Sequence, residues 1–179
     1  MEKNVIKIFR DSDFGLEDVE IKEPKRRRIV RGIVVDYSGA VAVFNKRIEN
    51  DYSLPGGVIG DGLSPEDAFL SEIKRKIGCE VEIIEDIGIV EEYMVQDEMI
   101  QETYVFVGRV LEKGKIDYKN QEIDEFGKVL WVSPEEGLKL ISDYKKEVNN
   151  GEIENLYHNK FSVYKDEYII RYYLINYIY

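Results

Sequence analysis

The stretch that decides the fold is YSLPGGVIGDGLSPEDAFLSEIKRKIG, which runs from Tyr52 to Gly78. It joins a Pro-Gly-Gly turn to a segment with the period of an amphipathic helix. Ser64 is a favoured N-cap, Pro65 fits the first helical position, and Gly78 ends the helix. A tight glycine turn followed by a capped helix with a central glutamate, Glu72, is the outline of a site for phosphate chemistry.

The residues on either side predict alternating strands and helices. NVIKIFR alternates like an edge strand, and two β-branched runs are joined by a turn at Ser38-Gly39. The expected strands after NVIKIFR are Ile29–Asp36, Ala40–Asn45, Glu80–Tyr93 with a break near Gly88, Thr103–Leu111 and KVLWVS. Further helices are expected over Pro134–Tyr144, capped by Ser133, and from about Lys165 onward. This order predicts an α/β fold, an α/β/α sandwich with a mixed β-sheet.

Two parts of the chain are distinguished. Residues 1–28 are expected to be an N-terminal strand extension and connector, and residues 29–179 to be the main domain with its C-terminal helix. KRRR, from Lys25 to Arg28, is basic enough to bind phosphate, but a solvated connector before a strand is the favoured interpretation. His158 is expected in an exposed loop and Trp131 in the core.

Composition excludes several classes of function. The chain has 179 residues and a net charge of −11, which disfavours binding to a nucleic-acid polymer. No apolar run reaches membrane-spanning length, and the charged start does not resemble a signal peptide, so a cytoplasmic protein without a membrane partner is expected. With one His and one Cys, any metal would need carboxylate ligands, which suit Mg²⁺ or Mn²⁺.

The order of strand, LPGG, helix with a central glutamate and terminal glycine resembles the Nudix (MutT-like) pyrophosphohydrolases. RDSDFGL, GIVEEY and WVS before a helix extend the resemblance over nearly the whole chain. It implies the Nudix α/β/α sandwich. The family signature is Gly, five residues, Glu, seven residues, Arg-Glu-apolar-any-Glu-Glu-any-Gly-apolar. Threaded from Gly57, it retains Glu72, Ile73 and Gly78.

The departures fall on the residues that carry the family's chemistry. In the family, glutamates on one helical face hold divalent ions that activate water. Here the signature's Glu, Arg and Glu-Glu pair are replaced by Leu63, Ser71, Arg75 and Lys76. A divalent ion about 4 Å from a lysine ammonium would be repelled by roughly 8 kcal/mol at an effective dielectric constant of ~20. No bound metal is therefore predicted, since Glu72 is the only carboxylate of the family signature that this sequence retains.

Three functions remain open. The leading one is a Nudix-fold protein with lost or strongly impaired metal-dependent hydrolysis, which binds a nucleotide or other phosphorylated small molecule or acts as a regulatory module. Arg75 and Lys76 would then supply directly the positive charge that a metal supplies in the family. Gly56 and Gly57 would allow close approach to the ligand. Phe44 and Tyr52 could stack on a nucleobase, although packing in the core or at its rim is an equally open interpretation for each.

The alternative is an active Nudix hydrolase that cleaves a nucleoside diphosphate linked to another moiety. It would use Mg²⁺ or Mn²⁺ in an altered metal set, with Glu72, Glu122 and Glu125 as catalytic residues. The third function is a purely structural module whose pocket is filled by side chains, with Leu63 packed inward. The aromatic end, YYLINYIY, could contact a second copy in a homodimer, although packing on its own domain is simpler.

Overall fold

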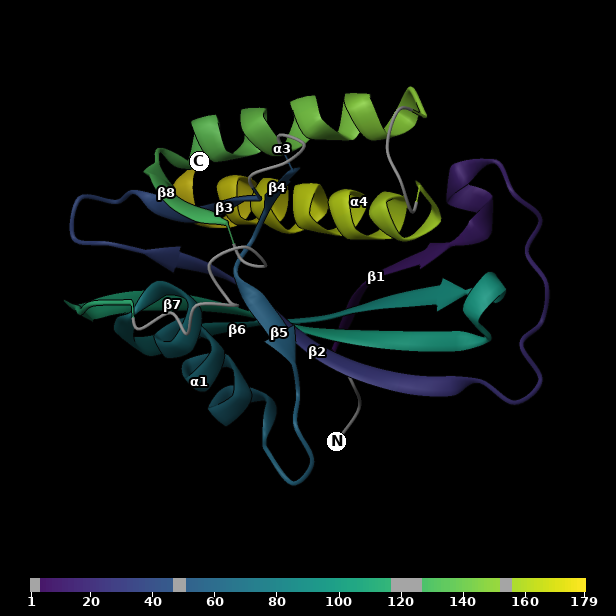
Figure 1. Ribbon diagram of the computed structural model, residues 1–179, viewed down its shortest axis with the longest axis horizontal. Helices are drawn as coiled ribbons and strands as arrows, with labels where there is room; N and C mark the ends of the chain where they lie inside the picture. Colours follow the sequence, from purple (N-terminus) through teal and green to yellow (C-terminus); the bar gives the residue numbers. More distant parts are fainter. Residues whose placement is uncertain (1–3, 47–50, 117–126, 152–155) are drawn as a thin grey trace.

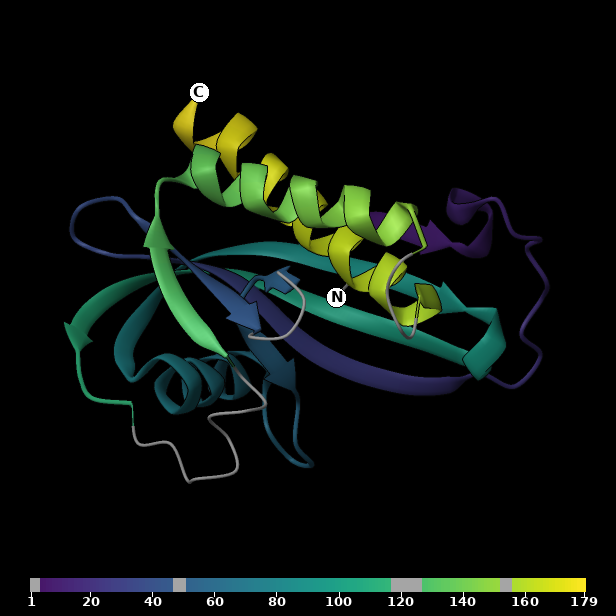
Figure 2. The ribbon, with the colours of Figure 1, turned by 45° about the horizontal axis from the view of Figure 1, so that its top comes forward.

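A computed structural model describes residues 4–46, 51–116, 127–151 and 156–179. Within these residues a mixed β-sheet lies between two helical layers (Figures 1 and 2). Helix α1 (Pro65–Ile77) packs on one face, and α3 (Pro134–Asn149) and α4 (Leu156–Tyr173) lie side by side on the other. This arrangement confirms the predicted α/β/α sandwich.

The sheet has the strand order β1-β6-β7-β2-β3-β4, while β5 pairs with β2 and β8 with β3. Strand β1 lies at an edge and pairs in parallel with β6, as β2 does with β7, whereas β6 and β7 are antiparallel. The strands are β1 (Val5–Arg10), β2 (Lys25–Val35), β3 (Val41–Lys46), β4 (Asp51–Ser53), β5 (Gly56–Val58), β6 (Cys79–Met94), β7 (Met99–Lys113) and β8 (Lys128–Val132). Short helical turns follow β1 (Asp11–Phe14), β6 (Val95–Asp97) and α4 (Leu174–Ile178).

The predicted connector at Lys25–Arg28 is wrong, because these residues form the first part of β2. Lys25 pairs with Met99, and the parallel register with β7 continues from there along the whole of β2, to Val35 opposite Arg109. The side chains of Lys25–Arg28 are exposed, so a basic sequence is compatible with a strand whose backbone pairs with β7. Composition indicated their solvation correctly but not their backbone conformation.

Helix α1 has the ends that its sequence predicts. Ser64 Oγ accepts a hydrogen bond from Asp67 N at 3.0 Å, and Gly78 has a left-handed φ of 73°. Phe69 anchors the helix on the sheet, where a Cβ on Gly32 would lie 2.4 Å from its ring. Since Phe69 is fully buried and packs against Phe106, this contact fixes the height of α1 above β2 and β7.

The C-terminal helices are longer than predicted. Helix α3 begins after Ser133 as expected but runs on to Asn149, and α4 begins at Leu156 rather than near Lys165. His158 is therefore helical, and the prediction that it lies in a loop is wrong. Because α4 buries Lys165 and Asp166 together with apolar residues, its sequence lacks a clear apolar stripe. In the described part of the chain, no helix is both long and apolar enough to span a bilayer.

Candidate functional site

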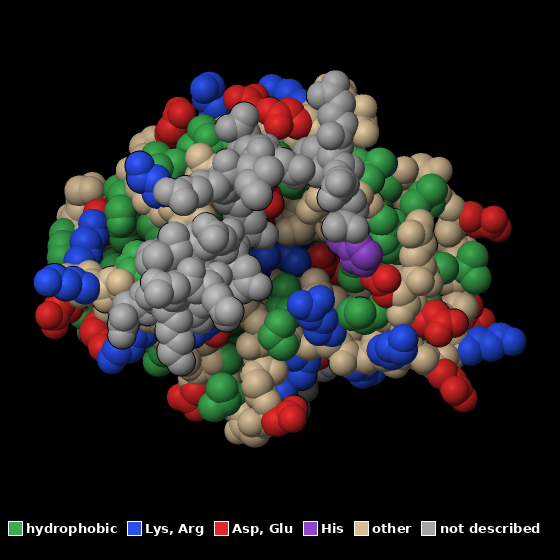
Figure 3. Space-filling view, in the orientation of Figure 1, with side chains coloured by type: hydrophobic (Ala, Val, Ile, Leu, Met, Phe, Trp, Pro, Cys, Tyr) green, Lys and Arg blue, Asp and Glu red, His purple; other side chains and the backbone are tan. Residues whose placement is uncertain are grey.

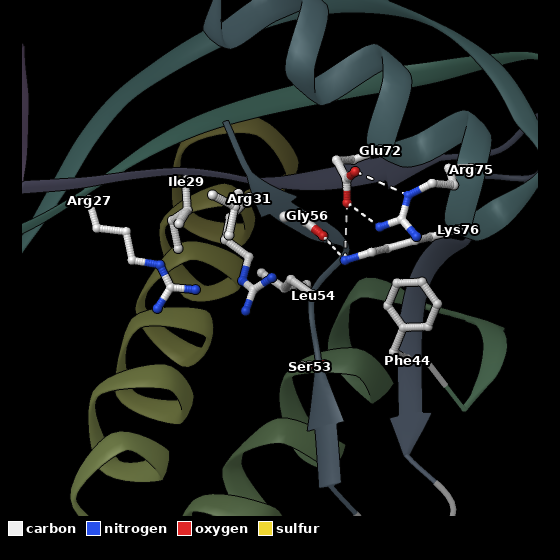
Figure 4. A pocket seen from close by; sticks show the side chains of 12 residues that line it. Arg27, Ile29, Arg31, Phe44, Ser53, Leu54, Gly56, Glu72, Arg75 and Lys76 are labelled. Atoms are coloured by element: carbon white, nitrogen blue, oxygen red, sulfur yellow. Dashed lines mark hydrogen bonds and ion pairs between the residues drawn. The ribbon is translucent and has the colours of Figure 1, made fainter. Parts of the chain in front are cut away.

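A pocket of about 430 Å³ opens between β2, the β4–β5 segment and α1 (Figure 4). Figure 3 shows Lys and Arg side chains in and around the hollow at the centre of this face. The lining residues are Arg27, Ile29 and Arg31 of β2, Phe44 of β3, Ser53 to Val58 apart from Pro55, and Glu72, Arg75 and Lys76 of α1. The pocket thus lies over the Pro-Gly-Gly turn and the helix that the sequence singled out.

The carboxylate of Glu72 is held by the two cations that follow it on α1. Arg75 donates through Nε to Oε1 at 3.2 Å and through Nη2 to Oε2 at 3.0 Å. Lys76 Nζ lies 3.2 Å from Oε2 and also donates to the Gly56 carbonyl oxygen. Both carboxylate oxygens are therefore engaged, since spacings of three and four residues bring these side chains together on a helix.

This donor set does not fit the divalent ions that Nudix hydrolases typically use. Mg²⁺ and Mn²⁺ prefer several oxygen ligands, whereas the described lining of the pocket offers one carboxylate, Glu72, which is already paired with two cations. Among the residues that the structure describes, no group of three or more His, Cys, Asp or Glu side chains could hold a metal ion. Glu122 and Glu125, the other predicted catalytic residues, lie outside the described residues.

Two pocket arginines were not predicted as site residues. Arg27 and Arg31 lie on β2 with Ile29 between them, and alternate strand residues point to the same face. In Figure 4 their guanidinium groups point into the space that Lys76 also approaches. Arg31 Nε lies 3.3 Å from Asp166 Oδ1 of α4. The alternation in RRRIVR was the available signal, but a sequence does not tell which face of the strand borders a pocket.

Positive charge prevails at this pocket. Of the described residues there, Arg27, Arg31, Arg75 and Lys76 are opposed by Glu72 and by Asp166, which leaves two formal positive charges. Burial lowers the pKa of Lys76, the Glu72 carboxylate opposes that change, and nearby Arg31 and Arg75 add to it. A pocket of this sign in a chain with a net charge of −11 is a local reversal of the protein's overall field.

The two predicted glycines line the pocket, but other atoms of the protein occupy the space that a side chain at either position would need. A Cβ on Gly56 would lie 2.0 Å from the Val30 carbonyl oxygen, and one on Gly57 would lie 2.1 Å from Glu72 Oε2. Glycine is therefore required at position 56, where β5 approaches the backbone of β2, whereas at position 57 it leaves room for the present position of the Glu72 side chain. That these glycines also allow close approach of a ligand stays a prediction.

The predicted aromatic residues are divided between two places. Phe44 lines the pocket and is also part of the core beneath α1. Tyr52 is partly buried against the other core cluster, beneath α3 and α4, so it does not form the predicted aromatic wall. Leu63 is 44% exposed, which contradicts the expectation of a filled pocket with Leu63 packed inward. Trp131 is partly buried against the core, close to its predicted place.

Comparisons with known proteins agree with this architecture. The NUDIX domain family matches residues 25–151. The MutT NUDIX hydrolase of Burkholderia pseudomallei is 16% identical, with 62% of this chain and 85% of that chain covered and a TM-score of 0.51. An ADP-ribose pyrophosphatase from Streptococcus suis is 15% identical, with 80% and 88% covered and a TM-score of 0.50.

A third structure, the E. coli ORF135 protein, is 19% identical, with 65% of this chain and 79% of that chain covered and a TM-score of 0.50. At these identities the likeness concerns the fold. No curated protein sequence matches the chain significantly. The family match over residues 25–151, together with the sandwich and the glycine turn that leads into α1, shows that this chain belongs to the NUDIX domain family.

Proposed function

We propose that this protein binds a phosphorylated small molecule of nucleotide size without a metal ion, and that metal-dependent pyrophosphate hydrolysis is lost or strongly impaired. The observation that carries the proposal is the pairing of Glu72 with Arg75 and Lys76. This pairing places ammonium and guanidinium groups where the family places metal-binding carboxylates. The site is then suited to attract phosphate directly.

The phosphate would be held mainly by β2 and α1. Among the described residues, no carboxylate lies within ion-pair distance of Arg27, and Arg31 Nε lies 3.3 Å from Asp166 Oδ1 while its terminal nitrogens point into the pocket. Their guanidinium forks match the oxygen atoms of a phosphate, and such charge-assisted hydrogen bonds are stronger than neutral ones. Lys76, 13% exposed at its side chain, adds a further positive charge at the inner wall.

The remaining pocket surface suits an organic group attached to the phosphate. Ile29, Phe44 and Val58 give an apolar lining next to the cations. The volume of about 430 Å³ falls in the range of roughly 300 to 1,000 Å³ that is common for small-molecule sites. A nucleotide combines these two requirements, an anionic end and a flat, mostly apolar end.

Calorimetric titration with ADP, once in EDTA and once in Mg²⁺, tests the proposal. We expect binding in EDTA of at least the strength seen in Mg²⁺. Replacing Arg27 with Gln should weaken binding by roughly 10- to 100-fold, the worth of one or two hydrogen bonds to a charged group. Lys139→Gln removes the same charge from an exposed position on α3, away from the pocket, and should leave ADP binding unchanged. Binding that requires Mg²⁺, with release of inorganic phosphate or AMP, would overturn the proposal.

A further inference from the structure

A second, smaller cavity adjoins the pocket on the side of α4. Its volume is about 160 Å³, and Arg27, Ile29 and Arg31 line both spaces. We call it the α4 compartment; its other polar walls are Glu92, Gln101, His158, Ser162 and Lys165. These three residues of β2 therefore form a wall that the main pocket and the α4 compartment share.

The carboxylate of Glu92 in the α4 compartment already has hydrogen-bond and ion-pair partners within the protein. Glu92 is fully buried, and Lys165 Nζ lies 3.0 Å from each of its carboxylate oxygens. Gln101 Nε2 donates to Oε2 at 2.6 Å and Thr103 Oγ1 donates at 3.1 Å. Three of these four contacts fall on Oε2 and one on Oε1, and Lys165 balances the charge of the carboxylate. Glu92 is thus not a source of uncompensated negative charge.

The groups that remain are donors or cations. Arg27 and Arg31 lie between the two spaces, Ser162 contributes a hydroxyl, and Lys165 has a third ammonium proton beyond the two that face Glu92. Arg31 Nε and Asp166 Oδ1 face each other at 3.3 Å, yet both are buried without an aligned hydrogen bond. The terminal nitrogens of Arg31 point into the main pocket in Figure 4, and Arg31 also lines the α4 compartment.

We propose that the α4 compartment binds a second anionic group of the same ligand, so that the ligand carries two anionic groups on either side of Arg27 and Arg31. This inference rests on the proposed function. The compartment has well under half the volume of the main pocket, so it suits a phosphate or carboxylate rather than a nucleoside. The ligand class is then a phosphorylated small molecule with a further terminal phosphate or carboxylate.

Displacement of ADP in EDTA by a series of linear alkane-α,ω-bisphosphonates and by the matching alkyl monophosphonates tests this inference. We expect bisphosphonates of one chain length to bind at least tenfold more tightly than the monophosphonate, with weaker binding at shorter and longer lengths. Such an optimum appears when a linker just spans two sites. Equal affinities at every length, after allowing for two equivalent ends, would overturn the α4 compartment as a site.

Substitutions at Ser162 locate the second site. Ser162→Asp places a negative charge in the compartment and should abolish the gain of the best bisphosphonate over the matching monophosphonate, with both measured in the same variant. In Ser162→Asn the new side chain has nearly the size of aspartate but no charge, so this variant should still bind the best bisphosphonate more tightly than the monophosphonate. A gain that survives in Ser162→Asp, or that Ser162→Asn also removes, would contradict an anion at this place. Failure of ADP itself to bind in EDTA would instead refute the proposed function, so the two failures are distinct.

Discussion

Asp166 of α4 accepts a hydrogen bond from the backbone N–H of Leu54, with a distance of 2.9 Å between Oδ2 and N across 112 residues of sequence. Its other oxygen lies 3.3 Å from Arg31 Nε. One fully buried carboxylate thus connects the C-terminal helix both to the start of the LPGG turn and to a pocket arginine. The shape of the pocket depends on a helix that lies on the opposite side of the sheet from α1.

Replacing Asp166 with Ala should lower the free energy of unfolding by about 3 to 5 kcal/mol, because Arg31 would lose the carboxylate that balances its charge and the buried Leu54 N–H would lose its acceptor. Urea denaturation followed by circular dichroism measures this loss. Asp143→Ala is the matched control, since its pair with Lys146 is exposed and should be worth less than about 1 kcal/mol. Equal losses in the two variants would refute the structural role of Asp166.

Changing Arg75 and Lys76 together to Glu should create affinity for Mg²⁺ or Mn²⁺, because the two new carboxylates and Glu72 would form a patch of three on α1. Calorimetric titration with Mn²⁺ gives the measurement. The control, Lys74→Glu with Lys139→Glu, makes the same change in net charge at exposed positions away from the patch. If both double variants gain Mn²⁺ affinity equally, general electrostatics and not the patch explains the exclusion of metal.

As the pH is raised, the affinity for ADP should begin to fall at a lower pH than it would if Lys76 had the pKa of an ordinary lysine. Burial lowers the pKa of Lys76 from its usual 10.5, so its positive charge is lost earlier as the pH rises. Lys76→Arg keeps the charge and should extend tight binding to higher pH. Affinities measured between pH 7 and 10.5 test this, with Lys74→Arg as the control on the exposed side of α1. Identical profiles for Lys76→Arg and the unaltered protein would count against a role for the Lys76 charge.

Asp36, in the turn between β2 and β3, should contribute to acid denaturation. Burial alone would raise its pKa, but hydrogen bonds from Lys113, Ser38 and the Ala40 N–H outweigh burial and lower the pKa to about 2. The lowered value stabilises the fold above the unfolded-state pKa of about 3.9, and this stabilisation is lost as the pH falls toward 2. Asp36→Asn should therefore reduce stability at pH 7.

The same variant should flatten the pH dependence of stability between about pH 4 and 2, because unfolding then involves about one proton less. Urea denaturation at a series of pH values measures both effects. Asp143→Asn, at an exposed pair, controls for the general effect of removing one carboxylate. Parallel curves for Asp36→Asn and the unaltered protein would show that Asp36 is not responsible.

The sequence alone determined what depends on neighbours along the chain. Ser64, Pro65 and Gly78 set the ends of α1 because capping is a local interaction. The patch of Glu72, Arg75 and Lys76 followed from helical spacing, and the structure brings these side chains together as expected. The alternation of strands and helices likewise predicted the layers of the sandwich.

The tertiary structure decided what depends on distant pairings. Arg27 and Arg31 face the pocket because β2 pairs with β7 in one register and with β5 beside it, and no local pattern fixes that choice. Tyr52 packs against the core beneath α3 and α4, because the pairing of β4 with β3 determines which side of the sheet it faces. The buried pair of Glu92 and Lys165 joins residues 73 apart, and α4 shows little periodicity because polar groups are enclosed within its packed faces. A single sequence records which residues can carry charge, but only the folded sheet determines which of them meet around one cavity.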